Sequence, residues 1–230
     1  MTKTQPLEIN RTGIFIDLCI YLAVMFLIRE VYFEQFNFIV NGLFWSFTTL
    51  IVATWRLRVR GVKWKDLGLT KPDRLLKTFL VSGAILIATF VVLIAFNVAL
   101  DVFNIAIGED HSDANAASKF GDLKNNWPLF FTIIPFIWLE SALEEILDRG
   151  FLMNWLEKLF SNGTFATILA VVVQAAIFGF RHSYDLSERS ITVGLIGLVM
   201  GTAYVLSGRN LWPLIIAHAL LNTFTMIDRV

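Results

Sequence analysis

The stretch FLVSGAILIATFVVLIAFNVAL, residues 79–100, carries no charged side chain and decides the class to which this protein belongs. A helix needs about 20 consecutive, predominantly apolar residues to cross the hydrocarbon core of a bilayer. This stretch meets that requirement without interruption. It therefore predicts a transmembrane helix.

Six further segments show the same long apolar pattern on both sides of residues 79–100. They cover about residues 13–27, 38–55, 128–160, 164–180, 191–206 and 211–227. We therefore predict an all-α, polytopic transmembrane helix bundle of about seven spans, with a range of six to eight. The segment 128–160 is the longest, and Pro135 could break it, because proline removes an interior hydrogen bond of a helix.

The composition supports an integral membrane protein and excludes several other classes. Of the 230 residues, 56% are hydrophobic and 17% are charged, against about 45–50% and 25% in soluble domains. The 19 basic residues equal the 19 acidic ones, so no surplus of positive charge indicates a nucleic-acid partner. The single cysteine, Cys19, excludes an intrachain disulfide and is expected to be a small buried hydrophobe. The length favours one integral membrane domain, residues 1–230.

One connection between predicted spans, residues 56–77, is strongly basic. It holds eight of the 19 basic residues: Arg56, Arg58, Arg60, Lys63, Lys65, Lys71, Arg74 and Lys77. The positive-inside rule assigns such a loop to the cytoplasmic side, and a lipid-headgroup site is a secondary interpretation. Seven spans then place the connection 148–163 on the same side and His182 toward the opposite face.

An acidic cluster interrupts the fourth span, which reads PFIWLESALEEILDRGFL over residues 135–152. Placing an ionised side chain at the bilayer centre costs roughly 2.5–3.5 kcal/mol of insertion free energy, so such residues indicate a functional or structural role. Helical spacing allows Glu145 to pair with Arg149 at i and i+4. Glu140, Glu144 and Asp148 form an adjacent acidic row, and a carboxylate in such a row is a candidate general base.

Histidines stand in two other apolar spans. The string QAAIFGFRHSYD, residues 174–185, places Phe178 one helical turn before His182. The string LIIAHALLNTF, residues 214–224, places His218 one turn before Asn222. Each feature alone has a structural explanation: a solvated acidic face, a packed histidine, or an asparagine bonded to a neighbouring helix. Their combination on three apolar helices favours a catalytic site between the helices.

Taken in order, these motifs resemble those of the type II CAAX-prenyl endopeptidase and bacteriocin-processing (CPBP, Abi-like) intramembrane proteases. The family pattern is EExxxR, then FxxxH, then HxxxN or HxxxD on successive membrane helices. Here the motifs read Glu144-Glu145-Ile-Leu-Asp-Arg149, Phe178-Gly-Phe-Arg-His182 and His218-Ala-Leu-Leu-Asn222. The resemblance covers about residues 125–228. One residue departs from the pattern: Asp148 stands where an apolar aromatic is usual, and it could compete with Glu145 for Arg149 or extend the acidic row.

The resemblance implies peptide-bond hydrolysis within or beside the membrane. Glu144 would be the general base, His182 would help to hold a water, and His218 with Asn222 would donate to the oxyanion. Glu145 and Arg149 would fix the geometry, and Phe178 would line the pocket. A metal-free mechanism is favoured. The alternative is Zn²⁺ held by Glu144, His182 and His218, although the sequence contains no H-E-x-x-H helix.

Two other classes of function remain open at this stage. The resemblance also permits a non-cleaving membrane immunity or scaffold protein that binds a peptide such as a bacteriocin. Intramembrane acids and histidines also mark transporters and proton relays. The expected partners are membrane lipid and a membrane-associated protein or peptide substrate. If the source is bacterial, the multi-pass protein is expected in the plasma membrane.

Overall fold

The computed structural model describes residues 10–72, 74–108 and 119–230, and the regular elements within these ranges are all helices. In chain order they are α1 (Arg11–Leu27), η1 (Ile28–Glu30), α2 (Phe38–Val59), η2 (Trp64–Leu67), α3 (Leu75–Phe103), α5 (Trp127–Glu145), η3 (Ile146–Met153), α6 (Asn154–Leu159), α7 (Thr164–Ser183), α8 (Glu188–Leu206) and α9 (Trp212–Ile227). The all-helical bundle predicted from the apolar segments is confirmed.

Five of the described helices are long and apolar enough to cross a membrane: α1 with η1, α2, α3, α7 and α8. The other two predicted spans are also helices. α9 is apolar but has only 16 residues, and α5 carries three glutamates in its last six residues. The two helices that least resemble ordinary lipid-facing spans are therefore those that carry the acidic cluster and His218. The protein is an integral membrane protein.

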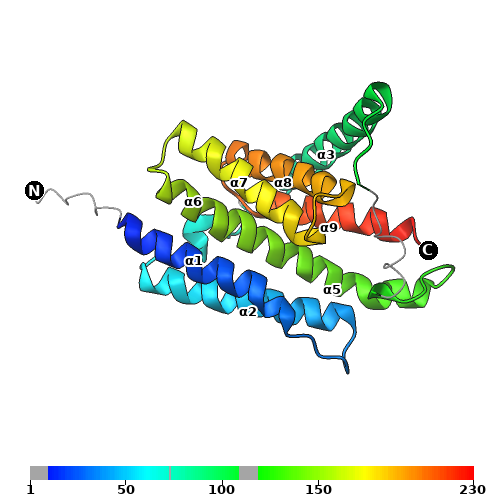
Figure 1. Ribbon diagram of the computed structural model, residues 1–230, viewed down its shortest axis with the longest axis horizontal. Helices are drawn as coiled ribbons and strands as arrows, with labels where there is room; N and C mark the ends of the chain where they lie inside the picture. The colour runs from blue at the N-terminus through cyan, green and yellow to red at the C-terminus, as the bar shows by residue number, and fades with distance from the viewer. Residues whose placement is uncertain (1–9, 73, 109–118) are drawn as a thin grey trace, which may run out of the picture.

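A continuous rod of α5, η3 and α6 forms the centre of the bundle (Figure 1). α1 and α2 pack on one side of this rod, and α7, α8 and α9 lie on the other (Figure 1). α3 contacts α8 and α9 and leans away from the other helices toward its C-terminal end. At about 1.5 Å per residue the rod is roughly 50 Å long, and Glu144 lies near its middle.

The rod does not break at Pro135, and that expectation is wrong. α5 runs through Pro135 to Glu145, because polar side chains and neighbouring helices can compensate for the lost hydrogen bond inside a membrane. The irregularity is η3, an eight-residue π-helix over Ile146–Met153. The Asn154 amide donates to the carbonyls of Arg149 and Gly150 at 3.0 and 2.8 Å, which satisfies backbone groups of the widened turns.

Glycines bring α7 and α8 into close backbone contact. A Cβ added at Gly179 would lie 2.3 Å from the Ser190 carbonyl oxygen, and one at Gly197 would lie 3.1 Å from Ala175 Cα. Small residues permit this approach between membrane helices. The contact fixes the end of α7, where His182 stands.

Asp17 anchors the end of the bundle that carries the basic connection. This fully buried carboxylate accepts hydrogen bonds from Arg56, Arg60 and the Trp155 indole, the two arginine contacts reaching 2.6 and 2.7 Å. It therefore joins α1 to α2 and to α6. Cys19, two residues further along α1, is exposed, so its expected burial is wrong; its side chain faces outward from a membrane helix.

A backbone hydrogen bond at Gly68 joins the basic connection to the turn between α8 and α9. The carbonyl of Gly68 accepts this hydrogen bond from the Leu211 amide at 3.0 Å. Its φ of 94° lies in the left-handed region, and an added Cβ would stand 1.8 Å from the Arg209 carbonyl oxygen. Glycine is the residue that fits both requirements.

Candidate active site

Glu144 and Glu145, adjacent at the end of α5, point in different directions and have different surroundings. Successive residues of a helix are rotated by about 100°. Glu145 is completely buried, whereas the Glu144 side chain keeps 13% of its surface exposed. The Glu145 carboxylate is therefore closed off from its surroundings, whereas the Glu144 carboxylate is accessible.

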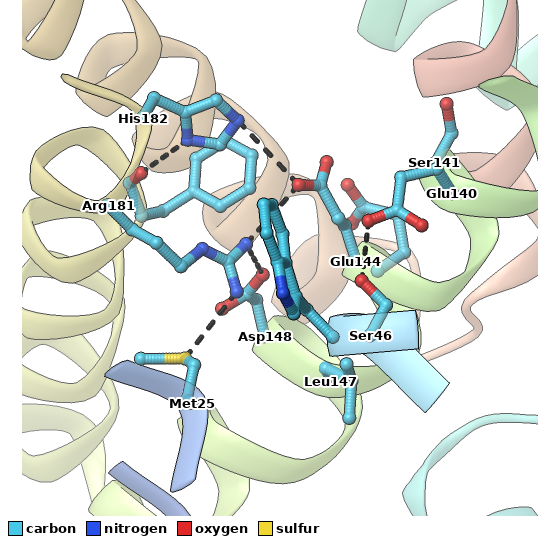
Figure 2. Close-up of polar contacts among 12 residues, drawn as sticks. Met25, Ser46, Glu140, Ser141, Glu144, Leu147, Asp148, Arg181 and His182 are labelled. Carbon is cyan, nitrogen blue, oxygen red and sulfur yellow. Dashed lines mark hydrogen bonds and ion pairs between the residues drawn. The ribbon is translucent and has the colours of Figure 1, made fainter. Parts of the chain in front are cut away.

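Glu144 lies between the two predicted histidines. Its Oε1 is 3.6 Å from His182 Nε2 at the end of α7, and its Oε2 is 3.7 Å from His218 Nε2 in α9. Figure 2 shows the Glu144 carboxylate directed toward His182 across the space between the helices. Three residues distant in sequence, predicted as one set, are therefore neighbours in space.

The Nδ1 atom of each imidazole, on the side of the ring away from Nε2, takes part in a hydrogen bond. His182 Nδ1 lies 2.7 Å from the Phe178 carbonyl oxygen, and His218 Nδ1 lies 2.7 Å from Glu145 Oε1. A carbonyl or carboxylate oxygen only accepts, so the proton belongs on Nδ1 in both rings. In the neutral ring, Nε2 then presents a lone pair toward Glu144.

Arg149 contacts Glu145, the carboxylate that bonds to His218. Its Nη1 is 3.0 Å from Glu145 Oε1, the i, i+4 pair expected from the sequence, and both side chains are fully buried. Its guanidinium carbon lies 4.5 Å from the centre of the Phe178 ring. That ring is 4.6 Å from the His182 ring. Phe178 therefore packs between the buried cation and the histidine.

Asp148 does not pair with Arg149. Its Oδ2 is 2.9 Å from Nη2 of Arg181, and the same Nη2 lies 3.4 Å from Glu144 Oε1 (Figure 2). Both side chains of the Asp148–Arg181 pair are at least 95% buried. Asp148, the residue that departs from the family pattern, therefore has Arg181 as its counter-ion. Arg181 directly precedes His182 in the sequence. Sequence spacing missed Arg181, because its partners lie on other helices.

The remaining polar residues near the site make hydrogen bonds to partners other than the histidines. Glu140 accepts a hydrogen bond from Ser46 in α2 (Figure 2). Asn222 donates its amide to Ser141 Oγ at 2.9 Å and stands one turn beyond His218 on α9. The acidic row of Glu140, Glu144 and Asp148 is thus divided among three partners: a hydroxyl, a pair of histidines and an arginine.

In the part of the chain that the structure describes, no group of three or more His, Cys, Asp or Glu side chains is arranged as a metal-binding set. The predicted Zn²⁺ alternative therefore depends on the chemistry of the donors, two imidazole nitrogens and a carboxylate, and stays a prediction.

Comparison with known families gives a match to part of the chain. Residues 125–224 match the family model described as type II CAAX prenyl endopeptidase Rce1-like, and this family is a family of proteases. No curated protein and no solved structure matches the chain. The matched segment contains α5, the π-helix and the residues of all three motifs. The family resemblance drawn from the motifs is therefore confirmed over residues 125–224, the segment in which this membrane protein is similar to the Rce1-like type II CAAX prenyl endopeptidase family.

Proposed function

We propose that this chain is an intramembrane endopeptidase that cleaves a membrane-associated protein or peptide, of CAAX type or related. The chain would act as one membrane domain, residues 1–230, with its catalytic core at about 125–228. The observation that carries the proposal is the position of Glu144, whose two carboxylate oxygens face the Nε2 atoms of His182 and His218 at 3.6 and 3.7 Å.

Glu144 acts as the general base in this proposal, and His182 holds the water. Glu144 Oε1 and His182 Nε2 are both acceptors, and a water has two hydrogens to donate. A water bonded to both would direct its oxygen lone pair away from them, toward a substrate carbonyl. Glu144 takes one proton as the water oxygen bonds to the carbonyl carbon, and the carbonyl π electrons move onto the carbonyl oxygen.

His218 and Asn222 stabilise the resulting oxyanion. As an imidazolium, His218 donates from Nδ1 to Glu145 and from Nε2 to the oxyanion. Asn222 uses one amide hydrogen on Ser141, and its second N–H remains for the oxyanion. Loss of one such donor costs about 10²–10³ in kcat in well-studied enzymes.

The intermediate collapses when Glu144 returns its proton to the amide nitrogen. The carbon–nitrogen bond breaks, the oxyanion re-forms a carbonyl, and the products are a carboxyl group and an amine. Glu145 and Arg149 hold His218 in place during these steps, and Phe178 packs against His182. In this proposal Glu145 and Arg149 act through His218, and Phe178 lines the pocket beside His182.

The test is cleavage of a quenched-fluorescent peptide library by the purified protein in liposomes. Glu144→Gln keeps the size of the side chain and removes the base, so cleavage should fall by about 10²–10⁴. Glu140→Gln is the matched control, because it makes the same change one turn away on the same helix, at a carboxylate that bonds to Ser46. That control should stay within a few-fold of the parent. Equal rates for Glu144→Gln and the parent would refute the assignment.

The same assay with a chelator separates the metal-free mechanism from the Zn²⁺ alternative. Cleavage that survives chelation supports the glutamate mechanism. Loss on chelation, restored by Zn²⁺, would instead assign Glu144, His182 and His218 to a metal. A non-cleaving immunity or scaffold role would be supported if cells that express Glu144→Gln keep full protection against a peptide toxin.

A further inference from the structure

A groove of about 1300 Å³ opens beside α3, away from the histidines. One wall is α3, the other is α8, and the floor near the basic connection is formed by the α8–α9 turn. We refer to it as the α3–α8 groove. Its volume exceeds the roughly 300–1,000 Å³ typical of sites for small molecules, so its size suits a longer ligand.

The walls of the groove are apolar over most of their length. On α3 they are formed by Val81, Ala84, Ala88 and Val92, spaced three or four residues apart on one helical face. On α8 they are formed by Leu198, Val199, Ala203 and Leu206. From Lys77 to Val92, α3 rises by roughly 22 Å, while one leaflet provides about 15 Å of hydrocarbon depth. The groove is therefore long enough to follow one acyl chain through a leaflet.

Three cations stand at one end of the groove: Lys65, Arg74 and Lys77, which we call the basic mouth. Among the described residues, none of the three takes part in an ion pair. The acid beside them, Asp66, accepts a hydrogen bond from the Lys63 amide. Arg209 also lines this end, but its charge is paired with Glu157 at 2.7 Å. The basic mouth thus keeps a local excess of positive charge at the end of an apolar channel.

We propose that the α3–α8 groove binds one anionic phospholipid from the leaflet on the side of the basic connection. The phosphate lies at the basic mouth, and one acyl chain lies between α3 and α8. The charge pattern favours this ligand, because a zwitterionic lipid brings an additional cation to the same mouth. The bound lipid fills the space between α3, which leans away from the bundle (Figure 1), and α8.

The experiment measures lipid retention by the full-length protein, purified in mild detergent and supplied with phosphatidylglycerol or phosphatidylcholine. Native mass spectrometry should find one phosphatidylglycerol per chain, held more tightly than phosphatidylcholine. Each basic residue near an anionic lipid contributes about fivefold in affinity. The triple variant Lys65→Gln, Arg74→Gln and Lys77→Gln should therefore lose phosphatidylglycerol affinity on the order of 100-fold.

A control variant removes the same charge from the same connection outside the groove. Arg58, Lys63 and Lys71 are exposed and do not line the groove, and replacing all three by glutamine should change retention by less than about fivefold. The apolar wall is tested by Ala88→Phe, which places a ring in the groove and should abolish the one-to-one complex. Ala95→Phe adds the same ring to an exposed position of α3 beyond the groove and should not.

Three results would overturn the proposal. Equal retention of the two lipids by the parent would remove the headgroup preference. If the two charge variants lost phosphatidylglycerol affinity equally, the lipid would be held by the general attraction of a basic loop and not by the basic mouth. Displacement of phosphatidylglycerol by one equivalent of a lipidated peptide would assign the groove to a substrate. The readout is binding, so its failure is distinguishable from failure of the proposed proteolysis.

Discussion

Replacing Arg181 by methionine should lower the free energy of unfolding by about 3–5 kcal/mol. Replacing Asp148 by leucine in the same molecule should restore most of that loss. Arg181 Nη2 lies 2.9 Å from Asp148 Oδ2, and the two side chains are 5% and 0% exposed. Without Arg181, the Asp148 carboxylate stays buried and loses its counter-ion.

The expected magnitude follows from the difference between breaking and replacing a buried ion pair. Removing one partner leaves an uncompensated charge, whereas exchanging both for apolar side chains of similar volume is often neutral or stabilising. The double variant also loses the 3.4 Å contact between Arg181 and Glu144. We therefore expect it to fall about 1–2 kcal/mol short of the parent, so that Asp148→Leu recovers about 2–3 kcal/mol in the Arg181→Met background.

The assay is reversible unfolding in mixed micelles, followed by tryptophan fluorescence, for the parent, both single variants and the double variant. The same cycle on Glu157 and Arg209 is the control. That pair is also close, at 2.7 Å, but its side chains are 10% and 35% exposed, so its coupling should not exceed about 1 kcal/mol. Additivity of the Asp148 and Arg181 changes within about 0.5 kcal/mol would refute the reasoning.

Three further predictions concern packing, catalysis and the basic end. Gly179→Ala should destabilise the fold by about 2–3 kcal/mol, because the new Cβ meets the Ser190 carbonyl oxygen at 2.3 Å. Gly42→Ala, with nothing within 4 Å of its Cβ, should be neutral or stabilising by up to about 1 kcal/mol in the same unfolding assay. Asn222→Leu should lower kcat by about 10²–10³ with a smaller change in KM; an effect on KM alone would contradict an oxyanion role. Asp17→Asn should lower stability by about 3 kcal/mol, and a melting temperature equal to that of the parent would show that this carboxylate is not needed.

The positions of the helices could be predicted from the sequence because a bilayer imposes a length and an apolar composition on each span. The stretch 79–100 lies inside α3, Leu75–Phe103, with only the ends displaced. The fourth span was predicted over 128–160 and is found as the continuous rod of α5, η3 and α6. The π-helix inside it could not be predicted, because the residue types of this segment do not distinguish the i→i+5 hydrogen bonds of a π-helix from the i→i+4 bonds of an α-helix.

Contacts along one helix were easier to predict than contacts between helices. The pair of Glu145 with Arg149 follows from i, i+4 spacing and is confirmed at 3.0 Å. The pair of Asp148 with Arg181 joins η3 to α7, and spacing within a helix carries no information about it. Glu144, His182 and His218 were predicted to meet because of their motifs, and they do meet. The roles given to them stay predictions.

The π-helix η3 also limits how the length of this chain can change. Each residue added to or removed from a helix turns everything beyond it by about 100°. η3 already holds its residues in widened π-helical turns, so one more residue added within Ile146–Met153 would rotate α6 about its axis. Trp155 would then leave Asp17, and Asn154 would leave Tyr204, which it contacts at 3.0 Å. A single-codon insertion in this segment should thus do more damage than most substitutions in it, and the number of residues between Glu145 and Asn154 cannot increase, whatever those residues are.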